Sequence, residues 1–295
     1  MPAAARRHLE ATENSVMSQA LLPPDPNFPL PSQALVTERI LPLPKVIRHA
    51  LMDKFCPEGL REAAKFSPLN NDCLACIYLG RRRNPDAPLA PNFSLRNFNF
   101  CPDQMLELEL PVEEYTRAMA GCLALIHWDA HMDGYDVEFV LGSDDEISYT
   151  THVTQSLGVD VEPIEQLPKH SDIEVLQRVN LQRRVTRPWV LDFNLCNRFP
   201  KDDTFILEHE EELVNQLVLA FFENDPYYPL PLMEMDVDKK LWTIFRREYE
   251  KKAEEILGAS ETMRHLPIKF LDACVERERR KLEKGLGHGH RGFKG

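Results

Sequence analysis

The sequence predicts an α+β fold that is mainly helical. Four long segments carry apolar residues at spacings of three and four, which is typical of helices that bury one face. Three shorter apolar runs, bounded by polar or turn-forming residues, are typical of strands. Because 43% of the 295 residues are apolar, the chain can bury one large core.

The first part of the chain should carry little regular structure. Residues 1–35 end in a Pro-rich stretch, which favours an extended and poorly packed conformation, so we expect a disordered start. The first clear strand is predicted at residues 73–79. This run is continuously apolar and lies between two polar turn sequences, which is the pattern of a buried strand.

The most regular helix is predicted at residues 112–126. Pro111 lies where a helix begins, and two glutamates follow in the first turn, where the helix dipole favours negative charge. One face of this helix is apolar and should be buried. It consists of Val112, Tyr115, Met119, Cys122 and Ile126.

Two further strands, at residues 136–141 and 189–193, should pair as a hairpin. The polar residues 142–187 between them are interpreted as an insertion, which is tolerated because closure entropy rises slowly with loop length. Amphipathic helices are then expected at about 208–223, 237–257 and 267–284. The predicted organisation is a single domain at 36–284 followed by a flexible tail at 285–295.

The charge balance argues against two classes of partner. Asp and Glu number 47 against 35 Lys and Arg, which leaves a formal net charge of −12. Such a chain repels phosphate backbones and anionic lipid, so we expect no nucleic-acid and no membrane partner. No apolar run approaches the ~20 residues that a membrane helix needs.

The cysteines indicate a reducing compartment. They are seven in number and irregularly spaced, and no secretory leader precedes them, so free thiols are expected. The predicted location is intracellular, either cytoplasmic or nuclear. The seven are Cys56, Cys73, Cys76, Cys101, Cys122, Cys196 and Cys274.

Two short motifs could carry chemistry. His127-Trp128-Asp129 ends the helix predicted from residue 112, and Asp192-Phe193-Asn194 ends the second strand of the hairpin. One aspartate after a helix can accept a proton from a hydroxyl group, while another at a hairpin end can hold a divalent metal against phosphate oxygens. The plainer alternative is structural: the first motif packs into the core and Asp192 caps a turn.

These motifs resemble the catalytic loop and the metal-binding loop of protein kinases and of the related aminoglycoside phosphotransferases. The resemblance implies a kinase-like C-lobe, with Asp129 as the catalytic base beside His127 and with Asp192 as a magnesium ligand. Gly134 stands where the kinase pattern has a second metal-binding residue, and Asp136 fits that role only after a short insertion. Mg-ATP would be the cofactor of such an enzyme.

The kinase pattern is incomplete upstream. No Gly-rich loop precedes Cys73 and no Val-Ala-Ile-Lys-like strand is present, so nothing in the sequence is expected to cover or pair with the phosphates. Lys45 and Lys54 lie in the wrong sequence context for that role. The prediction is therefore a kinase-like C-lobe with most of the N-lobe missing.

A broader resemblance runs from about residue 34 to residue 228. Several segments in order are similar to a fungal family of unknown function whose members are often labelled "zinc finger protein". The resemblance implies almost no biochemistry. The segments are 38–44, 76–82, 93–98, 126–141, 189–196 and 220–229.

The residues do not favour a zinc site. Cys73 and Cys76 form one CxxC pair, but it falls inside a predicted strand, and Cys101 stands alone. A structural zinc site needs four converging ligands, so two small buried side chains are the better interpretation and no metal ligand is predicted. His288 and His290 lie in the predicted tail, where weak metal binding is usually incidental.

Three functions follow in order of preference. The first is a non-catalytic, kinase-like binding or scaffold module without a cofactor, whose partner is an unidentified protein or small molecule. The second is a small-molecule phosphotransferase that uses Mg-ATP, with Asp129 as base and Asp192 as metal ligand. The third is a zinc-dependent binding protein, which the negative charge and the cysteine spacing both oppose.

Overall fold

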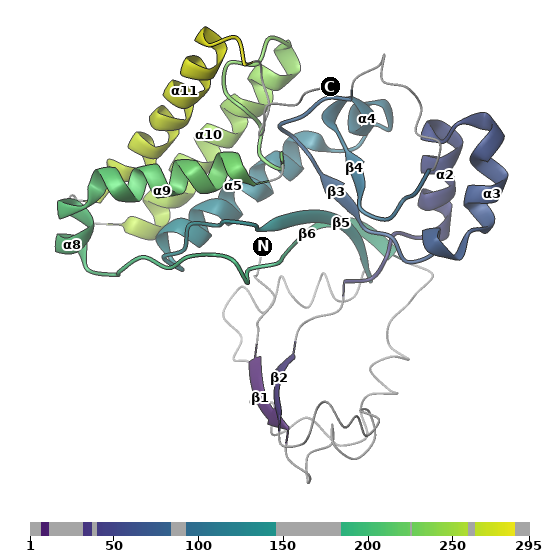
Figure 1. Ribbon diagram of the computed structural model, residues 1–295, viewed down its shortest axis with the longest axis horizontal. Helices are drawn as coiled ribbons and strands as arrows, with labels where there is room; N and C mark the ends of the chain where they lie inside the picture. Colours follow the sequence, from purple (N-terminus) through teal and green to yellow (C-terminus); the bar gives the residue numbers. More distant parts are fainter. Residues whose placement is uncertain are drawn as a thin grey trace.

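The computed structural model describes residues 7–11, 32–36, 40–83, 93–145, 184–224, 226–258 and 263–286. A small mixed sheet lies beside a group of long helices, which confirms the predicted α+β class (Figure 1). No helix in these ranges is both long and apolar enough to cross a bilayer.

The sheet has four strands in the order β4-β3-β5-β6, and its antiparallel hairpin is the one predicted from sequence. The strands are β3 (Ala75–Ile77), β4 (Phe98–Phe100), β5 (Glu138–Asp145) and β6 (Arg184–Leu191). Strand β4 pairs with β3 in parallel, and β5 pairs with β3 and β6 in antiparallel.

The bounds of the hairpin differ from the prediction. The β5–β6 ladder continues past residue 141 to the Asp145–Arg184 pair, so the outer residues of the predicted 142–187 insertion are strand. Gly142 permits this, because a Cβ atom there would lie 2.5 Å from Ile40 Cγ2 and 3.0 Å from Trp189 Cδ1. Residues 146–183 of the predicted insertion lie outside the described part of the chain.

The long helices confirm the predicted periodicity. Helix α5 (Val112–Trp128), α10 (Asp236–Leu257) and α11 (Leu266–Glu283) each begin and end within two residues of the predicted bounds. The helix expected at about 208–223 is α9 (Glu210–Glu223), and a short helix that was not predicted, α8 (Asp203–Glu208), precedes it. Asp202 starts α8 by accepting the backbone amide hydrogens of Thr204 and Phe205.

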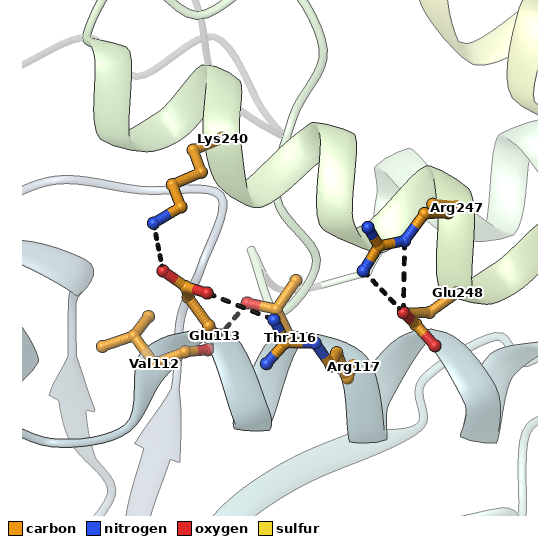
Figure 2. A network of polar contacts seen from close by, with 7 residues as sticks. All are labelled: Val112, Glu113, Thr116, Arg117, Lys240, Arg247 and Glu248. Atoms are coloured by element: carbon orange, nitrogen blue, oxygen red, sulfur yellow. Dashed lines mark hydrogen bonds and ion pairs between the residues drawn. The ribbon is translucent and has the colours of Figure 1, made fainter.

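Helix α10 lies along α5, and a polar network joins their surfaces (Figure 2). Glu113 of α5 forms an ion pair with Lys240 of α10. It forms a second ion pair, at 3.2 Å, with Arg117 of its own helix. Lys240 lowers the pKa of the Glu113 carboxyl by stabilising its charged form. Thr116 is fully buried and donates its hydroxyl to the Val112 carbonyl over 2.8 Å.

Several short elements have no counterpart among the predicted ones. The sequence before β3 forms helices α2 (Lys45–Phe55) and α3 (Arg61–Phe66) with the 3₁₀ turns η1 (Glu58–Leu60) and η2 (Pro68–Asn70). Helix α4 (Pro102–Glu107) follows β4. Each spans only one to three turns, too short for a periodic apolar face to stand out.

Within the predicted disordered start the structure has two short strands, β1 (Arg7–Ala11) and β2 (Ser32–Val36), which pair in antiparallel. The composition of this segment gave no indication of the pairing, because it depends on two runs that lie 20 residues apart. The other residues of 1–35 lie outside the described part of the chain.

An aromatic turn joins the sheet to the helices. Tyr227 and Tyr228 are each 1% exposed, and Tyr228 stacks on Phe221 of α9 with ring centroids 5.0 Å apart. The backbone amides of Leu79 and Gly80, just after β3, donate to the carbonyls of Tyr227 and Pro226. Both tyrosine rings of this turn are therefore used for packing.

Candidate functional site

The two motif-bearing loops lie against each other. Backbone bonds connect the loop after α5 with the loop after β6: Asp133 donates to the Asn197 carbonyl over 3.0 Å, and Phe199 donates to that of His131 over 3.0 Å. Met132 and Arg198 form an antiparallel bridge between them. Residues nearly 70 positions apart in the sequence therefore share one surface.

His127 is the most enclosed of the predicted site residues. Its side chain is 1% exposed, and its Nδ1 lies 2.7 Å from the hydroxyl oxygen of Tyr249 in α10. Trp128 Nε1 donates to the same oxygen over 2.9 Å. The backbone carbonyl of Asp133 can only accept, so the hydrogen of the neutral imidazole is donated to it, and Nδ1 accepts the proton of the Tyr249 hydroxyl.

Burial also fixes the charge of this imidazole. Desolvation lowers the pKa of His127 to about 3, and the carbonyl and carboxylate of Asp133 offset only part of that effect. The side chain is therefore neutral at physiological pH. A proton-transfer group works best with a pKa near the working pH, which His127 does not have.

Asp129 has the opposite surroundings. It follows the last residue of α5, where its backbone amide donates to the Leu125 carbonyl over 3.1 Å, and its side chain is exposed. No residue in the described ranges forms a hydrogen bond or ion pair with its carboxylate. The carboxylate lies at the negative end of the helix dipole, where a negative charge is disfavoured.

Asp136 and Asp192 lie at the same end of the β5–β6 hairpin. The register pairs Glu138 with Leu191, so the residues just before β5 and just after β6 are close to each other. Both aspartates are half-buried and both have a φ of +63°. Aspartate tolerates this left-handed conformation better than most residues, and such positions are often functional.

The sequence reasoning missed Asp133, the most completely bonded carboxylate of the two loops. It is 3% exposed. Its Oδ1 accepts the amide hydrogens of Tyr135 at 3.0 Å and Asn197 at 2.9 Å. Its Oδ2 accepts the side-chain amides of Asn197 at 2.9 Å and Gln216 at 3.0 Å. The Asp133-Gly134 pair indicates a turn, but three of these four bonds come from distant positions that no local pattern could identify.

Asn224 holds the other side of the same turn. It is 4% exposed and accepts the backbone amide of Asp136 over 2.6 Å. Its side-chain nitrogen donates to the carbonyls of Gly134 at 3.2 Å and Val137 at 3.3 Å. The backbone of Asp136 is thus held by a buried amide at the end of α9.

Metal ligands do not converge in the described part of the chain. No three His, Cys, Asp or Glu side chains gather there closely enough to hold an ion, and this includes Asp129, Asp136 and Asp192. Cys73 and Cys76 are 1% and 6% exposed within the core. All seven cysteines are free thiols, and burial raises the pKa of Cys101 and of Cys122 to about 12.

One segment of the chain matches a known family. Residues 188–261, which run from β6 to just past α10, are similar to a domain family of unknown function described as "Zinc finger protein". The match covers 74 of the 295 residues. The match supports the predicted resemblance to a family of unknown function with this label, and of the segments that suggested it, it covers 189–196 and 220–229.

The matched segment does not contain the ligands that its description implies. Cys196 and His209 are its only cysteine and histidine, whereas a structural zinc site takes four such ligands. No curated protein and no solved structure matches the chain.

Proposed function

We propose that this protein is a non-catalytic binding or scaffold module of the intracellular compartment, built on a degenerate kinase-like C-lobe. The observation that carries the proposal is the use of His127 and Asp133 for internal bonding. A phosphotransferase needs a carboxylate with free lone pairs at the loop after the helix, to accept a proton from the substrate hydroxyl.

The H-x-D spacing of kinase catalytic loops occurs twice in this loop, and neither copy suits that task. In His127-Trp128-Asp129 the histidine is buried and bonded to Tyr249, while no residue in the described part of the chain orients the Asp129 carboxylate. In His131-Met132-Asp133 all four amide donors around Asp133 occupy its two oxygens. A substrate hydroxyl would have to displace one of them.

The kinase-like lineage is supported by the order of the elements. A long helix, a polar loop, an antiparallel hairpin and an Asp-containing turn follow one another, and the two loops are in contact. Between β2 and β3 the described residues form helices α2 and α3, and β1 and β2 pair with each other in a separate sheet. The sequence before β3 has no Gly-rich loop of the kind that covers nucleotide phosphates.

The small-molecule phosphotransferase is kept as the second candidate because of Asp136 and Asp192. Two half-buried aspartates with positive φ at one hairpin end could hold Mg²⁺ together with nucleotide phosphates, since magnesium commonly takes one or two protein carboxylates. Asp129, exposed at an unfavourable helix end, would then be the base.

A titration with Mg-ATP distinguishes the two. Ligand that binds the native state raises the melting temperature by mass action, by several degrees at 100 times the dissociation constant. We expect no shift up to millimolar Mg-ATP in the wild type. A dose-dependent shift that the D192N variant loses and the K251E surface control retains would favour the phosphotransferase.

A further inference from the structure

A groove of about 910 Å³ opens between helices α9 and α11. These two helices contact each other beside α10 (Figure 1). Its apolar lining includes Val218 and Ala273 together with two large exposed side chains, Leu219 at 45% and Leu286 at 58% exposure. Single exposed leucines are ordinary, but a hollow with leucines at the surface is typical of a binding groove.

Most basic side chains along the groove are neutralised within the chain. These ion pairs are Lys269 with Glu210 and Glu211, Arg280 with Glu276 at 2.9 Å, and Lys281 with Glu278 at 2.9 Å. Arg277 and Lys284 differ, because neither forms an ion pair with any carboxylate of the described ranges. Two cations without an ion pair therefore border the apolar floor, against one lining carboxylate, Glu212, that has no ion pair among the described residues.

Arg277 is also held in place. Its Nη1 lies 3.5 Å from the Val218 carbonyl oxygen of α9, and its guanidinium carbon lies 4.9 Å from the ring centroid of Phe222. The side chain is half-buried, so little further rotamer entropy is lost when it binds an anion. A positioned guanidinium beside an apolar floor is suited to a carboxylate on an amphipathic ligand.

We propose that this groove docks an acidic amphipathic helix of a partner protein, with its apolar face on the floor and its carboxylates against Arg277 and Lys284. Two neighbouring helices offer ridges and a groove into which a third helix can pack. The net charge of −12 repels acidic partners elsewhere, so these two cations would also fix where and in which direction the helix binds. The inference rests on the proposed binding function and names its partner class.

The first test uses three fluorescein-labelled 18-residue peptides and the full chain. One carries leucine at helical spacing with glutamate on the other face, one has the same composition scrambled, and one has lysine in place of glutamate. Fluorescence anisotropy should show the acidic amphipathic peptide binding at least about tenfold more tightly than either of the others. Raising the salt from 0.05 to 0.3 M should weaken it by shortening the Debye length.

Two variants test the surface itself. R277E/K284E should weaken binding of the acidic peptide at least about tenfold, while K45E/K251E, an equal charge change at exposed lysines outside the groove, should leave it unchanged. L219D should weaken binding of the acidic peptide likewise. Its control is L106D on α4, where the leucine is 43% exposed, and this variant should bind the peptide as the wild type does. Circular dichroism before each titration verifies that the variants are folded.

The outcomes separate this inference from the proposed function. Equal binding of all three peptides, no binding, or binding that R277E/K284E and L219D leave intact would overturn the groove proposal. Self-association that L219D abolishes, seen by sedimentation, would also overturn it, since a second copy would then be the occupant. A Mg-ATP-dependent activity would refute the non-catalytic function whether or not the peptide binds.

Discussion

Gln216 of α9 donates its side-chain amide to Oδ2 of Asp133 over 3.0 Å, and this bond ties the helix to the loop that follows α5. Gln216 also lines the groove between α9 and α11. Gln216 therefore contributes both to the loop that carries Asp133 and to the groove between α9 and α11. The loop that carries the two H-x-D pairs is thereby connected to the helical layer.

Removing the Asp133 carboxylate should destabilise the fold. In D133A the amides of Tyr135, Asn197 and Gln216 lose a charged acceptor, and we expect the free energy of unfolding to fall by about 2–4 kcal/mol. Urea denaturation measures this. D129A is the matched control: its exposed carboxylate has no bonded partner among the described residues, so the change should stay within about 0.5 kcal/mol.

The hydroxyl group of Tyr249 should stabilise the fold in addition to the packing of its ring. Y249F keeps the aromatic packing on Phe270 but leaves His127 Nδ1 and Trp128 Nε1 without their shared partner in a buried site. We expect a loss of about 2 kcal/mol or more in the free energy of unfolding. A loss below about 0.5 kcal/mol would show that water or another group satisfies these atoms.

His127 should make the fold sensitive to acid. Its pKa is about 3 in the folded chain and near its ordinary 6.5 when unfolded, so the unfolded state binds the additional proton as the pH falls below 6.5. Stability is then lost progressively from pH 6.5 toward pH 3, by up to about 1.4 kcal/mol per pH unit for one proton. Burial also lowers the pKa of His131, which adds loss of the same sign.

The comparison of H127Q with the wild type isolates the first contribution. Below pH 6.5 the plot of unfolding free energy against pH should be less steep in H127Q than in the wild type. The difference in slope should be up to about 1.4 kcal/mol per pH unit, which corresponds to one proton, whatever the stability of H127Q at pH 7. H131Q should reduce the slope as well, to a lesser extent. Identical slopes in H127Q and the wild type would mean that His127 is not buried in the neutral form.

Cys196 should be the thiol that reacts in the native protein. It is the one half-buried cysteine of the seven, and the other six are buried. Ellman's reagent should label one thiol rapidly in the folded chain and all seven after denaturation, because the attacking species is an accessible thiolate. The C196S variant should show no rapid phase. A rapid phase that persists would contradict the burial of the other six.

The long helices and the hairpin could be predicted from the sequence because each has a periodic apolar face that is recognisable within its own segment. Pro111 with its two glutamates located the start of α5 correctly. The site was harder to predict, since its atoms are paired over long distances. Nothing near His127 indicates Tyr249, and nothing near Asp133 indicates Gln216. The H-x-D motif indicated the loop after α5, whereas the long-range partners of His127 and Asp133 include side chains of α9 and α10.

The most direct test of the non-catalytic account is phosphate release from ATP by the purified chain in excess Mg²⁺. We expect the wild-type rate to equal that of a D129N/D136N/D192N triple variant and the buffer background, because no oriented base and no phosphate-pairing lysine is predicted. A wild-type rate clearly above background that the triple variant abolishes would contradict the non-catalytic account.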